Sequence, residues 1–349
     1  MNAGVPTLMV QSDTGLTNQI QTTTNLALAN WTVLTNLMVT TSPYTFADNI
    51  SPPASRRFYR IQVIAPTNSI PANMVLIPAG SFQMGNAFAN EGDSSELPVH
   101  SVFVSAFYMD KFEVQKSLWD DVRLWSAARG YSYDNTGDGK ATNHPAYYMD
   151  WYDAVKWCNA RSQKEGRVPA YYTDAVLTQV YTNGQVAPYV NWNAGYRLPT
   201  EAEWEKGARG GLAGHRFPWG NTDLITHSNA NYYSSATYSY DVSPTRGYNP
   251  AFVDASQIYT SPVGSFAPNG YGLYDMAGNV WEWTWDYAGN YTSASQTDPR
   301  GPDSGTSRVG KGGNWNFYAE HLRCSYRFGN APGYAANNIG FRCALPKSN

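Results

Sequence analysis

The residues best suited to chemistry lie close together in one run, GLYDMAGNVWEW, at residues 272–283. Asp275 and Glu282 supply carboxylates there, and the carbonyls near Gly278 and Val280 add backbone oxygens. Hard oxygen ligands of this kind, interrupted by glycine, can wrap a calcium ion within one loop. The same run also fits a turn followed by a strand with polar ends, and residue chemistry alone leaves both interpretations open.

A second run, GGNWNFYAEHLRCSYR at residues 312–327, places a histidine and a cysteine among aromatic and amide side chains. His321, next to Glu320, is the histidine that we consider as a general base, with a solvated surface histidine as the alternative. Cys324 is one of three cysteines in the chain, so at most one pair can form within it. No Cys or His cluster has zinc spacing, and the sequence contains neither HExxH nor GxSxG.

The composition limits the classes of partner. With 24 basic and 27 acidic residues the net charge is −3, so no basic excess could follow a phosphate backbone. We therefore expect no nucleic-acid partner. Aromatic residues make up 15% of the chain, as many as the charged residues. This balance suits sugar or peptide recognition, although tyrosine and tryptophan also fill irregular cores.

No membrane span is expected, because no apolar run approaches the ~20 residues that a span needs. The N-terminal residues MNAGVPTLMVQS lack a basic segment followed by an apolar one. The protein is therefore expected either to be cytoplasmic or to be extracytoplasmic with its leader removed. Sparse lysine and abundant Asn, Thr and Tyr favour the second interpretation.

The elements that position these residues divide the chain into three parts. Residues 1–66 are predicted to form a small β-rich module, because β-branched and aromatic residues recur in strand-length runs between turn residues. Residues 67–73, with proline and small polar residues, are the predicted linker. Residues 74–346 are predicted to form one domain, in which strand-like stretches alternate with few helices.

Three helices are expected in this domain. Apolar periodicity predicts them at about 115–127 and 150–163, and a third begins at Thr200, where TEAE forms a capping box. Glu201, Glu203 and Glu205 are assigned to the start of this third helix, where they complement its dipole. The stretch 207–270 lacks periodicity, and loops of that length usually need an anchor such as a metal ion.

A series of motifs then occurs in a fixed order along the chain. They are MVLIPAGSFQMG, ELPVHSVFVSAFYMDKFEV, WYDAVKWCNA, YRLPTEAEWEKGARGG, FPWG, SPVGSFAPNGYGLYDMAGNVWEW, RVGKGGNWNF, LRCSYR and NNIGFRCA. This series resembles the formylglycine-generating enzyme family, also called the sulfatase-modifying-factor domain, over about residues 73–346. The resemblance implies a variant of the C-type lectin fold. We therefore expect an α+β, C-type-lectin-like domain with little regular secondary structure, preceded by the small all-β module.

The resemblance also implies one or two bound Ca²⁺ ions. The second calcium site of the family maps onto the side chains of Asp275 and Glu282 and the carbonyls of Gly278 and Val280. The first maps onto Asn231 and Tyr232. An acidic residue before TSPVGSF should complete the first site, and Asp254 is the nearest candidate.

The activity that names the family oxidises a cysteine in unfolded sulfatases to formylglycine, with two active-site cysteines that bind Cu(I). Soft thiolates are the ligands that Cu(I) prefers. In this sequence the first position carries Phe317, and the second falls near Leu322. The resemblance therefore implies neither copper nor formylglycine-generating activity. It also implies a disulfide between Cys158 and Cys343 in an oxidising compartment.

The former substrate groove is expected to remain. By resemblance, it is lined by Trp281, Asn314, Trp315, Asn316, Phe317, Arg327 and Asn338. Aromatic walls with amide and guanidinium groups can bind a peptide or a glycan, and this is our leading hypothesis for the function. One alternative is an oxidative or hydrolytic enzyme rebuilt at residues 314–327, with His321 and Arg327 as catalytic candidates. Another is a structural module of a secreted assembly, and the sequence does not indicate an oligomeric state.

Overall fold

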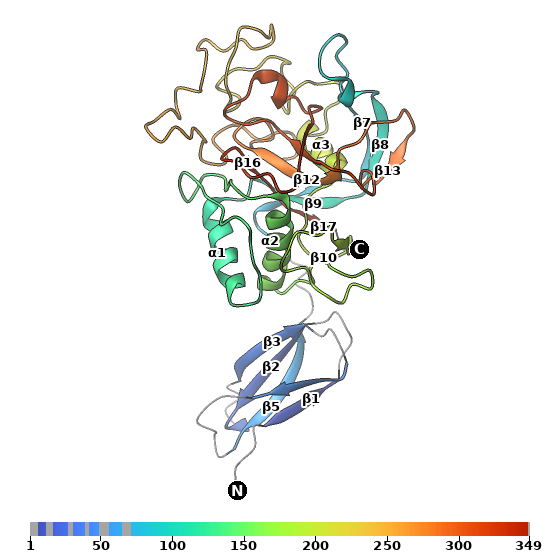
Figure 1. Cartoon of the computed structure of the whole chain (residues 1–349), viewed down its shortest axis with the longest axis vertical. Coiled ribbons are helices and arrows are strands. Elements are labelled where there is room, and N and C mark those ends of the chain that lie inside the picture. The colour runs from blue at the N-terminus through green and yellow to red at the C-terminus, as the bar shows by residue number, and fades with distance from the viewer. Residues whose placement is uncertain are drawn as a thin grey trace.

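The structure of the protein is a computed structural model that describes residues 6–11, 17–26, 31–38, 42–48, 56–64 and 71–347. Figure 1 shows the strands of the first 64 residues at the end of the molecule that carries the N-terminus, apart from the remaining chain. Most of the linker predicted at residues 67–73 lies outside the described residues. The exact domain boundaries therefore stay predictions.

The N-terminal part is built from strands, which confirms its predicted β-rich character. They are β1 (Thr7–Val10), β2 (Thr17–Thr23), β3 (Thr32–Met38), β4 (Tyr44–Ala47) and β5 (Phe58–Ile64). β1 pairs with β4, and β2 lies between β3 and β5, all antiparallel. Val10 and Ile20 are buried, whereas Met9 and Ile61 are exposed. The central strand β2 is buried at successive residues 20–23, whose side chains alternate between its two faces, so this strand is covered on both sides.

The larger part contains three α-helices among its described residues, as predicted. They are α1 (Lys116–Ala127), α2 (Trp151–Lys164) and α3 (Glu201–Arg209). The predicted capping box begins α3: the Thr200 hydroxyl accepts from the Glu203 amide at 3.1 Å, and the Glu203 carboxylate accepts from the Thr200 amide at 2.8 Å. α1 packs beside α2 (Figure 1). Within the described residues, no helix has the length and apolar character that crossing a membrane requires.

The strands of this part are short and form four small sheets among the described residues. They are β6 (Met74–Ile77), β7 (Gly80–Met84), β8 (His100–Val104), β9 (Phe107–Asp110), β10 (Tyr171–Tyr172), β11 (Tyr189–Val190), β12 (Trp281–Tyr287), β13 (Gln296–Thr297), β14 (Arg308–Lys311), β15 (Phe328–Asn330), β16 (Ile339–Gly340) and β17 (Ala344–Pro346). The strand orders are β15-β14-β12-β16, β13-β8-β7, β17-β9-β6 and β10-β11. Single 3₁₀ turns lie at Ser94–Glu96 and Ala319–Leu322.

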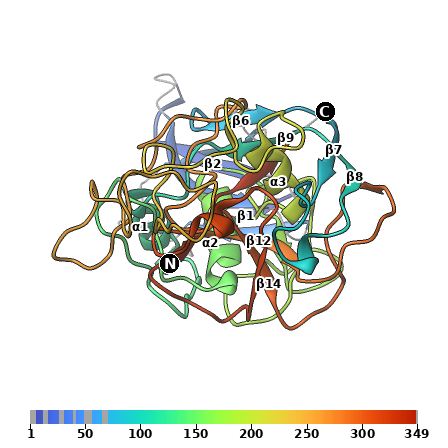
Figure 2. The same ribbon diagram turned by 90° about the horizontal axis from the view of Figure 1, so that it is seen from above.

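Long loops connect these elements, and residues 210–280 contain neither a helix nor a strand. α3 ends at Gly210, which has a φ of 57° and lies so close to Gly270 that an added Cβ would meet its amide at 2.8 Å. α3 also packs on β12, where the Trp204 indole donates to Glu282 at 2.7 Å. Figure 2 shows α3 and β12 near the middle of the view, with the yellow-to-orange loops toward its edge. The α+β architecture with little regular secondary structure is confirmed.

Candidate functional site

The predicted calcium loop is tightly curled. Asp275, Gly278 and Asn279 adopt left-handed backbone conformations, with φ angles of 55°, 86° and 63°. Glycine is required at position 278, because a Cβ there would lie 2.3 Å from the carbonyl oxygen of Asn231. The amide of Asn279 donates to that same oxygen at 2.9 Å. The structure therefore places Asn231 and the 275–282 loop, predicted for two separate calcium sites, side by side.

One buried oxygen in each predicted calcium site lacks a hydrogen-bond partner. Oδ2 of Asp275 accepts from the Gly264 amide at 2.6 Å, but its Oδ1 has no partner. The Asn231 side chain donates through Nδ2 to the Tyr259 carbonyl at 2.7 Å, and its Oδ1 has no partner. Among the fully buried side-chain atoms of the described residues, these are the only amide or carboxylate oxygens in that condition. Because buried polar atoms are normally hydrogen-bonded, both oxygens indicate a bound cation or water.

Glu282, the other carboxylate of the second site, is surrounded by donors. It accepts from two nitrogens of Arg342, both at 2.7 Å, and from the Trp204 indole. Glu113, which sequence reasoning did not select, accepts from a backbone amide and a side-chain amide of the 275–282 loop. Burial, and then the charge of Asp275, raises the pKa of Glu113 well above its ordinary value. The only sequence signal for Glu113 was its place in the motif that ends DKFEV.

In the first predicted calcium site, the side-chain oxygen without a hydrogen-bond partner belongs to Asn231. Asp254 lies at the surface, where a lysine side chain pairs with it at 2.7 Å. The buried carboxylate beside Tyr232 is Asp241, which accepts from the Tyr232 hydroxyl at 2.7 Å. The Tyr232 carbonyl lies 3.2 Å from Nε2 of His227. Of the two residues predicted for this site, Asn231 thus contributes the unpartnered side-chain oxygen.

A further acidic group lies at the start of α2. Carboxylate oxygens of Asp134, Asp150 and Asp153 lie within 4.8 Å of one another. Lys156 pairs with Asp134 at 3.1 Å and with Asp153 at 3.4 Å. Asp150 caps α2 by accepting from the Asp153 amide at 2.7 Å. A lysine and helix capping therefore account for this cluster without a metal ion.

Trp281 and Phe317 of the predicted groove belong to one cluster of rings with His321, the histidine considered as a general base. The ring centroids of Trp281 and Phe317 are 5.9 Å apart, and those of Phe317 and His321 are 4.8 Å apart. Tyr326 packs on His321 at 4.6 Å, and Phe328 stacks on Trp281 at 5.1 Å. Burial lowers the pKa of His321, so its imidazole is neutral at neutral pH. His321 is therefore a packed histidine rather than a solvated one.

Trp315 and Asn316 form a second part of the groove. The Trp315 ring centroid lies 5.9 Å from that of Tyr248 and 5.4 Å from that of Tyr259. Asn316 is exposed, and its side-chain oxygen accepts from the Tyr248 hydroxyl at 3.0 Å. Asn314 is buried and supports the loop, because its Oδ1 accepts from the Asn316 amide at 2.7 Å. Asn316 thus exposes an amide beside the half-buried rings of Tyr248 and Tyr259, whereas the Trp315 ring beneath them is only 5% exposed.

Backbone hydrogen bonds connect the groove to the predicted calcium loop. The Gly278 amide donates to the Gly312 carbonyl at 2.8 Å, and the Trp315 amide donates to the Asn279 carbonyl at 2.9 Å. Asn338 contributes its carbonyl, which accepts from the first amide of β12 at 2.8 Å. These hydrogen bonds join the backbone of the predicted calcium loop to the backbone of residues predicted for the groove.

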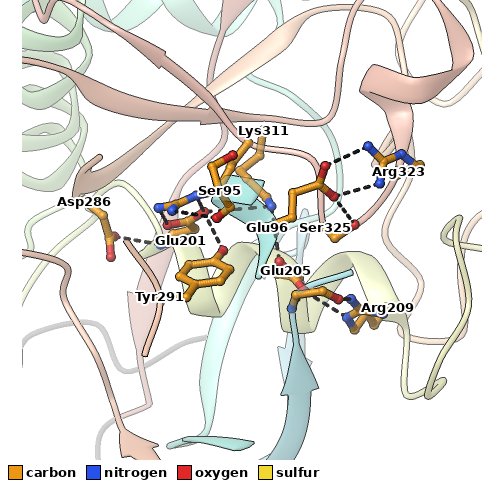
Figure 3. A network of polar contacts seen from close by, with 12 residues as sticks. Ser95, Glu96, Glu201, Glu205, Arg209, Asp286, Tyr291, Lys311, Arg323 and Ser325 are labelled. Carbon is orange, nitrogen blue, oxygen red and sulfur yellow. Dashed lines mark hydrogen bonds and ion pairs between the residues drawn. The ribbon is translucent and has the colours of Figure 1, made fainter. Parts of the chain in front are cut away.

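Arg327, also predicted for the groove, directs its guanidinium to other residues. It donates to Glu201 through hydrogen bonds of 2.8 and 2.6 Å, and lies over the ring of Tyr291 at 4.3 Å from its centroid. Figure 3 shows Glu201 and Tyr291 together in a network of polar contacts that also contains Glu205 and Lys311, which pair at 3.2 Å. Glu201 and Glu205 of α3 are thus partners in buried ion pairs. The sequence alone assigns them only to the start of the helix, as complements to its dipole.

Comparison with known proteins agrees with this fold. Residues 62–347 match the family model for the sulfatase-modifying factor enzyme 1-like domain. This chain belongs to that family. Formylglycine-generating enzymes from Bos taurus and Thermomonospora curvata are 36% and 35% identical to it. Each alignment covers 79% of this chain. The first covers 75% of the Bos taurus protein, and the second covers 94% of the Thermomonospora curvata protein.

Solved structures of similar proteins share the sulfatase-modifying factor fold of this chain. Treponema denticola variable protein 1 is 29% identical, with a TM-score of 0.60 over 78% of this chain and 94% of its own. CarF is 27% identical, with a TM-score of 0.58 over 79% of this chain and 98% of its own.

The cysteines of this sulfatase-modifying factor homologue lie in its core. The sulfurs of Cys158 and Cys343 are buried and 3.7 Å apart, as thiols, so their oxidation to a disulfide stays a prediction. Cys324 is fully buried, and burial raises its pKa to about 12. Phe317, at the position implied for the first active-site cysteine, belongs to the ring cluster. A thiolate for copper is therefore not offered by Cys324 at neutral pH.

Proposed function

We propose that this protein is a calcium-stabilised member of its family that binds a peptide or a glycan in its groove and performs no copper-dependent oxidation. The observation that carries the calcium part is the pair of unpartnered buried oxygens, Oδ1 of Asp275 and Oδ1 of Asn231. The binding part rests on the half-buried rings of Tyr248 and Tyr259 and the accessible amide of Asn316.

Calcium fits the donors of the second site, because they are hard oxygens. Ca²⁺ takes six to eight oxygen ligands, and the loop offers the unpartnered oxygen of Asp275 with the carbonyls of Gly278 and Val280. Glu282 would have to exchange part of its bonding to Arg342 and Trp204 for the ion. Together with Glu113, Asp275 and Glu282 place three buried carboxylates near one guanidinium. A divalent cation would offset this excess of buried negative charge. Its role would be structural, because it would hold a loop that no helix or strand supports.

The groove suits ligand binding better than it suits copper chemistry. The half-buried rings of Tyr248 and Tyr259 can pack on a sugar face or an aliphatic side chain, and the Asn316 amide can fix the orientation of a polar group. Cu(I) needs soft thiolate ligands. The groove carries Phe317 where the family resemblance implies a cysteine, and Cys324 is buried with its proton retained.

Asp275→Asn tests the calcium part. Asparagine can still accept from the Gly264 amide, so the change removes the charge and little else. Wild-type protein should melt at a higher temperature in calcium than in chelator, by the equivalent of about 2.7 kcal/mol at a hundredfold excess over Kd. The variant should lose most of this shift. Asp254→Asn, which removes an exposed carboxylate, is the matched control and should keep the wild-type response. An equal calcium response in wild type and Asp275→Asn would refute the proposal.

Peptide and glycan arrays, probed with calcium-loaded protein, test the binding part. A ligand found in this way should bind Tyr248→Ala at least about fivefold more weakly, because aromatic contacts that a ligand covers commonly contribute more than 1 kcal/mol. Asn316→Ala should bind more weakly but melt like wild type, because its side chain is exposed. If both variants retain full affinity, the ligand binds elsewhere. If neither array gives a ligand, the structural-module hypothesis takes its place.

An enzyme with a rebuilt site is the alternative, and His321 is the observation that favours it. A neutral imidazole 3.6 Å from the Glu320 carboxylate, among aromatic rings, has the chemistry of a general base. His321→Gln should then abolish turnover of a bound ligand while leaving its affinity and the melting temperature unchanged. Turnover that persists in this variant would exclude His321 as the base.

A further inference from the structure

A cavity of about 480 Å³ lies at the N-terminus of α3. Its walls come from the starts of α3 and β8, the end of β12, and the loop at residues 289–302. His100, Asp286 and Tyr291 line it, as does Arg327, which the predicted groove also includes. A volume of this size suits a small organic ligand.

Asp286 has an unpartnered oxygen in the wall of this cavity. The residue is 3% exposed, and its Oδ2 accepts from the Glu201 amide at 2.7 Å, at the first turn of α3. Its Oδ1 receives no hydrogen bond from the described residues. Gly301 packs directly on this side chain, since an added Cβ would lie 2.8 Å from the Cβ of Asp286 and 3.0 Å from Oδ1. The carboxyl group is thus held in place by its surroundings with one oxygen available.

The neighbouring charges leave Asp286 without a cation of its own. Arg327 is already paired with Glu201, whose Oε1 also accepts from the Tyr291 hydroxyl at 2.9 Å. Arg308 lies over the ring of Tyr287 rather than on a carboxylate. The charged and titratable groups around Asp286 or on the cavity wall are Glu201, Glu203, Arg327, Arg308, His100, Arg300, Tyr287 and Tyr291. Burial, and then the charge of Glu201, raises the pKa of Asp286 to about 8.

We propose that this cavity binds an organic ammonium ion, with the Asp286 carboxylate as its counter-ion. A cation would supply the partner that Oδ1 lacks and offset the burial of its charge. The rings of Tyr287 and Tyr291 in the wall can contact the methylene groups next to the ammonium, or the cation itself.

A metal ion fits this cavity less well than an ammonium ion. Hard cations such as Ca²⁺ need several oxygen ligands, and the second carboxylate of the wall, Glu201, is bonded by Arg327 and Tyr291. Where Asp286 is ionised, a free carboxylate or phosphate would add negative charge beside it; the wall also contains Arg300 and Arg327, of which Arg327 is paired with Glu201. An ammonium group needs one carboxylate and nearby acceptors, which Asp286 and the side chain of Gln296 can provide.

Calorimetric titration of the full chain with n-butylammonium tests this proposal, with n-butanol as a neutral probe of the same shape. Because binding requires Asp286 to ionise, affinity for the cation should rise by up to about tenfold per pH unit below about pH 8. Titration at neutral pH in buffers with different ionisation enthalpies should show release of nearly one proton. Asp286→Asn should lose at least about tenfold in affinity near pH 8 and lose the pH dependence. Asp254→Asn should bind like wild type.

Three results would overturn the proposal. The first is the absence of n-butylammonium binding by the wild-type chain at millimolar concentration near pH 8. The second is n-butanol binding as tightly as the cation, which would assign the cavity to neutral ligands. The third is unchanged affinity in Asp286→Asn. If that variant does not fold, the pH dependence and proton release of the wild type decide the question alone.

Discussion

Asp286→Asn should make the unliganded protein more stable at neutral pH, because it removes a buried group that must take up a proton on folding. The pKa of Asp286 rises from an ordinary value of 3.8 to about 8 in the folded chain. Between these values the unfolded chain has lost the proton and the folded chain retains it. The folded state therefore binds more protons, and the free energy of unfolding falls as the pH rises through this window.

The magnitude follows from the size of the pKa shift. The two states differ by about four pKa units, and each unit corresponds to about 1.4 kcal/mol. The full loss of stability in the wild type is therefore at most about 6 kcal/mol, and it is complete above about pH 8. Asparagine does not titrate, and its side-chain oxygen can still accept from the Glu201 amide. The advantage of the variant should thus grow by about 1 kcal/mol per pH unit between about pH 5 and pH 8.

Urea unfolding followed by tryptophan fluorescence, in amine-free buffers across this pH range, measures the difference. Equal m values in the two proteins would show that their unfolding transitions expose the same surface. Asp254→Asn is the control, because the side-chain hydrogen bond from Lys140 lowers the pKa of that exposed carboxyl. The Asp254→Asn substitution should therefore lower the free energy of unfolding only at pH values above the ordinary carboxyl range. A difference between wild type and Asp286→Asn that stays constant or shrinks with rising pH would refute the reasoning.

Other substitutions test separate parts of the fold. Glu96→Gln leaves the buried guanidinium of Arg323 without its counter-ion, drawn in Figure 3, and should cost about 3–5 kcal/mol in urea unfolding; a cost below about 1 kcal/mol would contradict this. Gly278→Ala should lower the melting temperature and remove calcium protection, because its φ is 86° and its Cβ would meet a backbone oxygen at 2.3 Å; a wild-type melting curve in calcium would count against the curled loop. Mild oxidation should join Cys158 and Cys343, seen as a loss of about 2 Da in the intact mass and a gain of about 2–4 kcal/mol in stability. Cys158→Ser should prevent this change in mass, and an unchanged wild-type mass under excess oxidant would disprove the pairing.

Features that depend on neighbours in the chain could be predicted well. Thr200 and Glu203 lie three residues apart, so the capping box that begins α3 is a local property and appears as predicted. The glycine and carboxylate spacing of the 275–282 loop likewise indicated a curled, oxygen-rich turn, and the backbone of Asp275 and Gly278 adopts it. The long stretch without periodicity after α3 indeed contains no helix or strand.

Features that depend on distant segments could not be predicted in the same way. Arg327 pairs with Glu201 across 126 positions of the chain, so its guanidinium joins the polar network of α3. Glu113 approaches the calcium loop across 166 positions, and no spacing rule connects them. His321 is neutral because rings pack around it, whereas its sequence context equally suited a solvated residue.

The sequence by itself determined the family, the helix starts, the glycine-dependent curl of the 275–282 loop and the lack of a cysteine at position 317, because these depend on residue type and order. Only the tertiary structure decided which polar atoms lack partners and which carboxylates lack counter-ions. Oδ1 of Asp275 and Oδ1 of Asn231 are unpartnered because two segments far apart in the chain meet there. Asp286 holds its proton because a helix start, a strand end and a glycine loop bury most of its side chain beside the charge of Glu201. Burial and charge are set by the assembled neighbours of a residue, and those neighbours are chosen by packing.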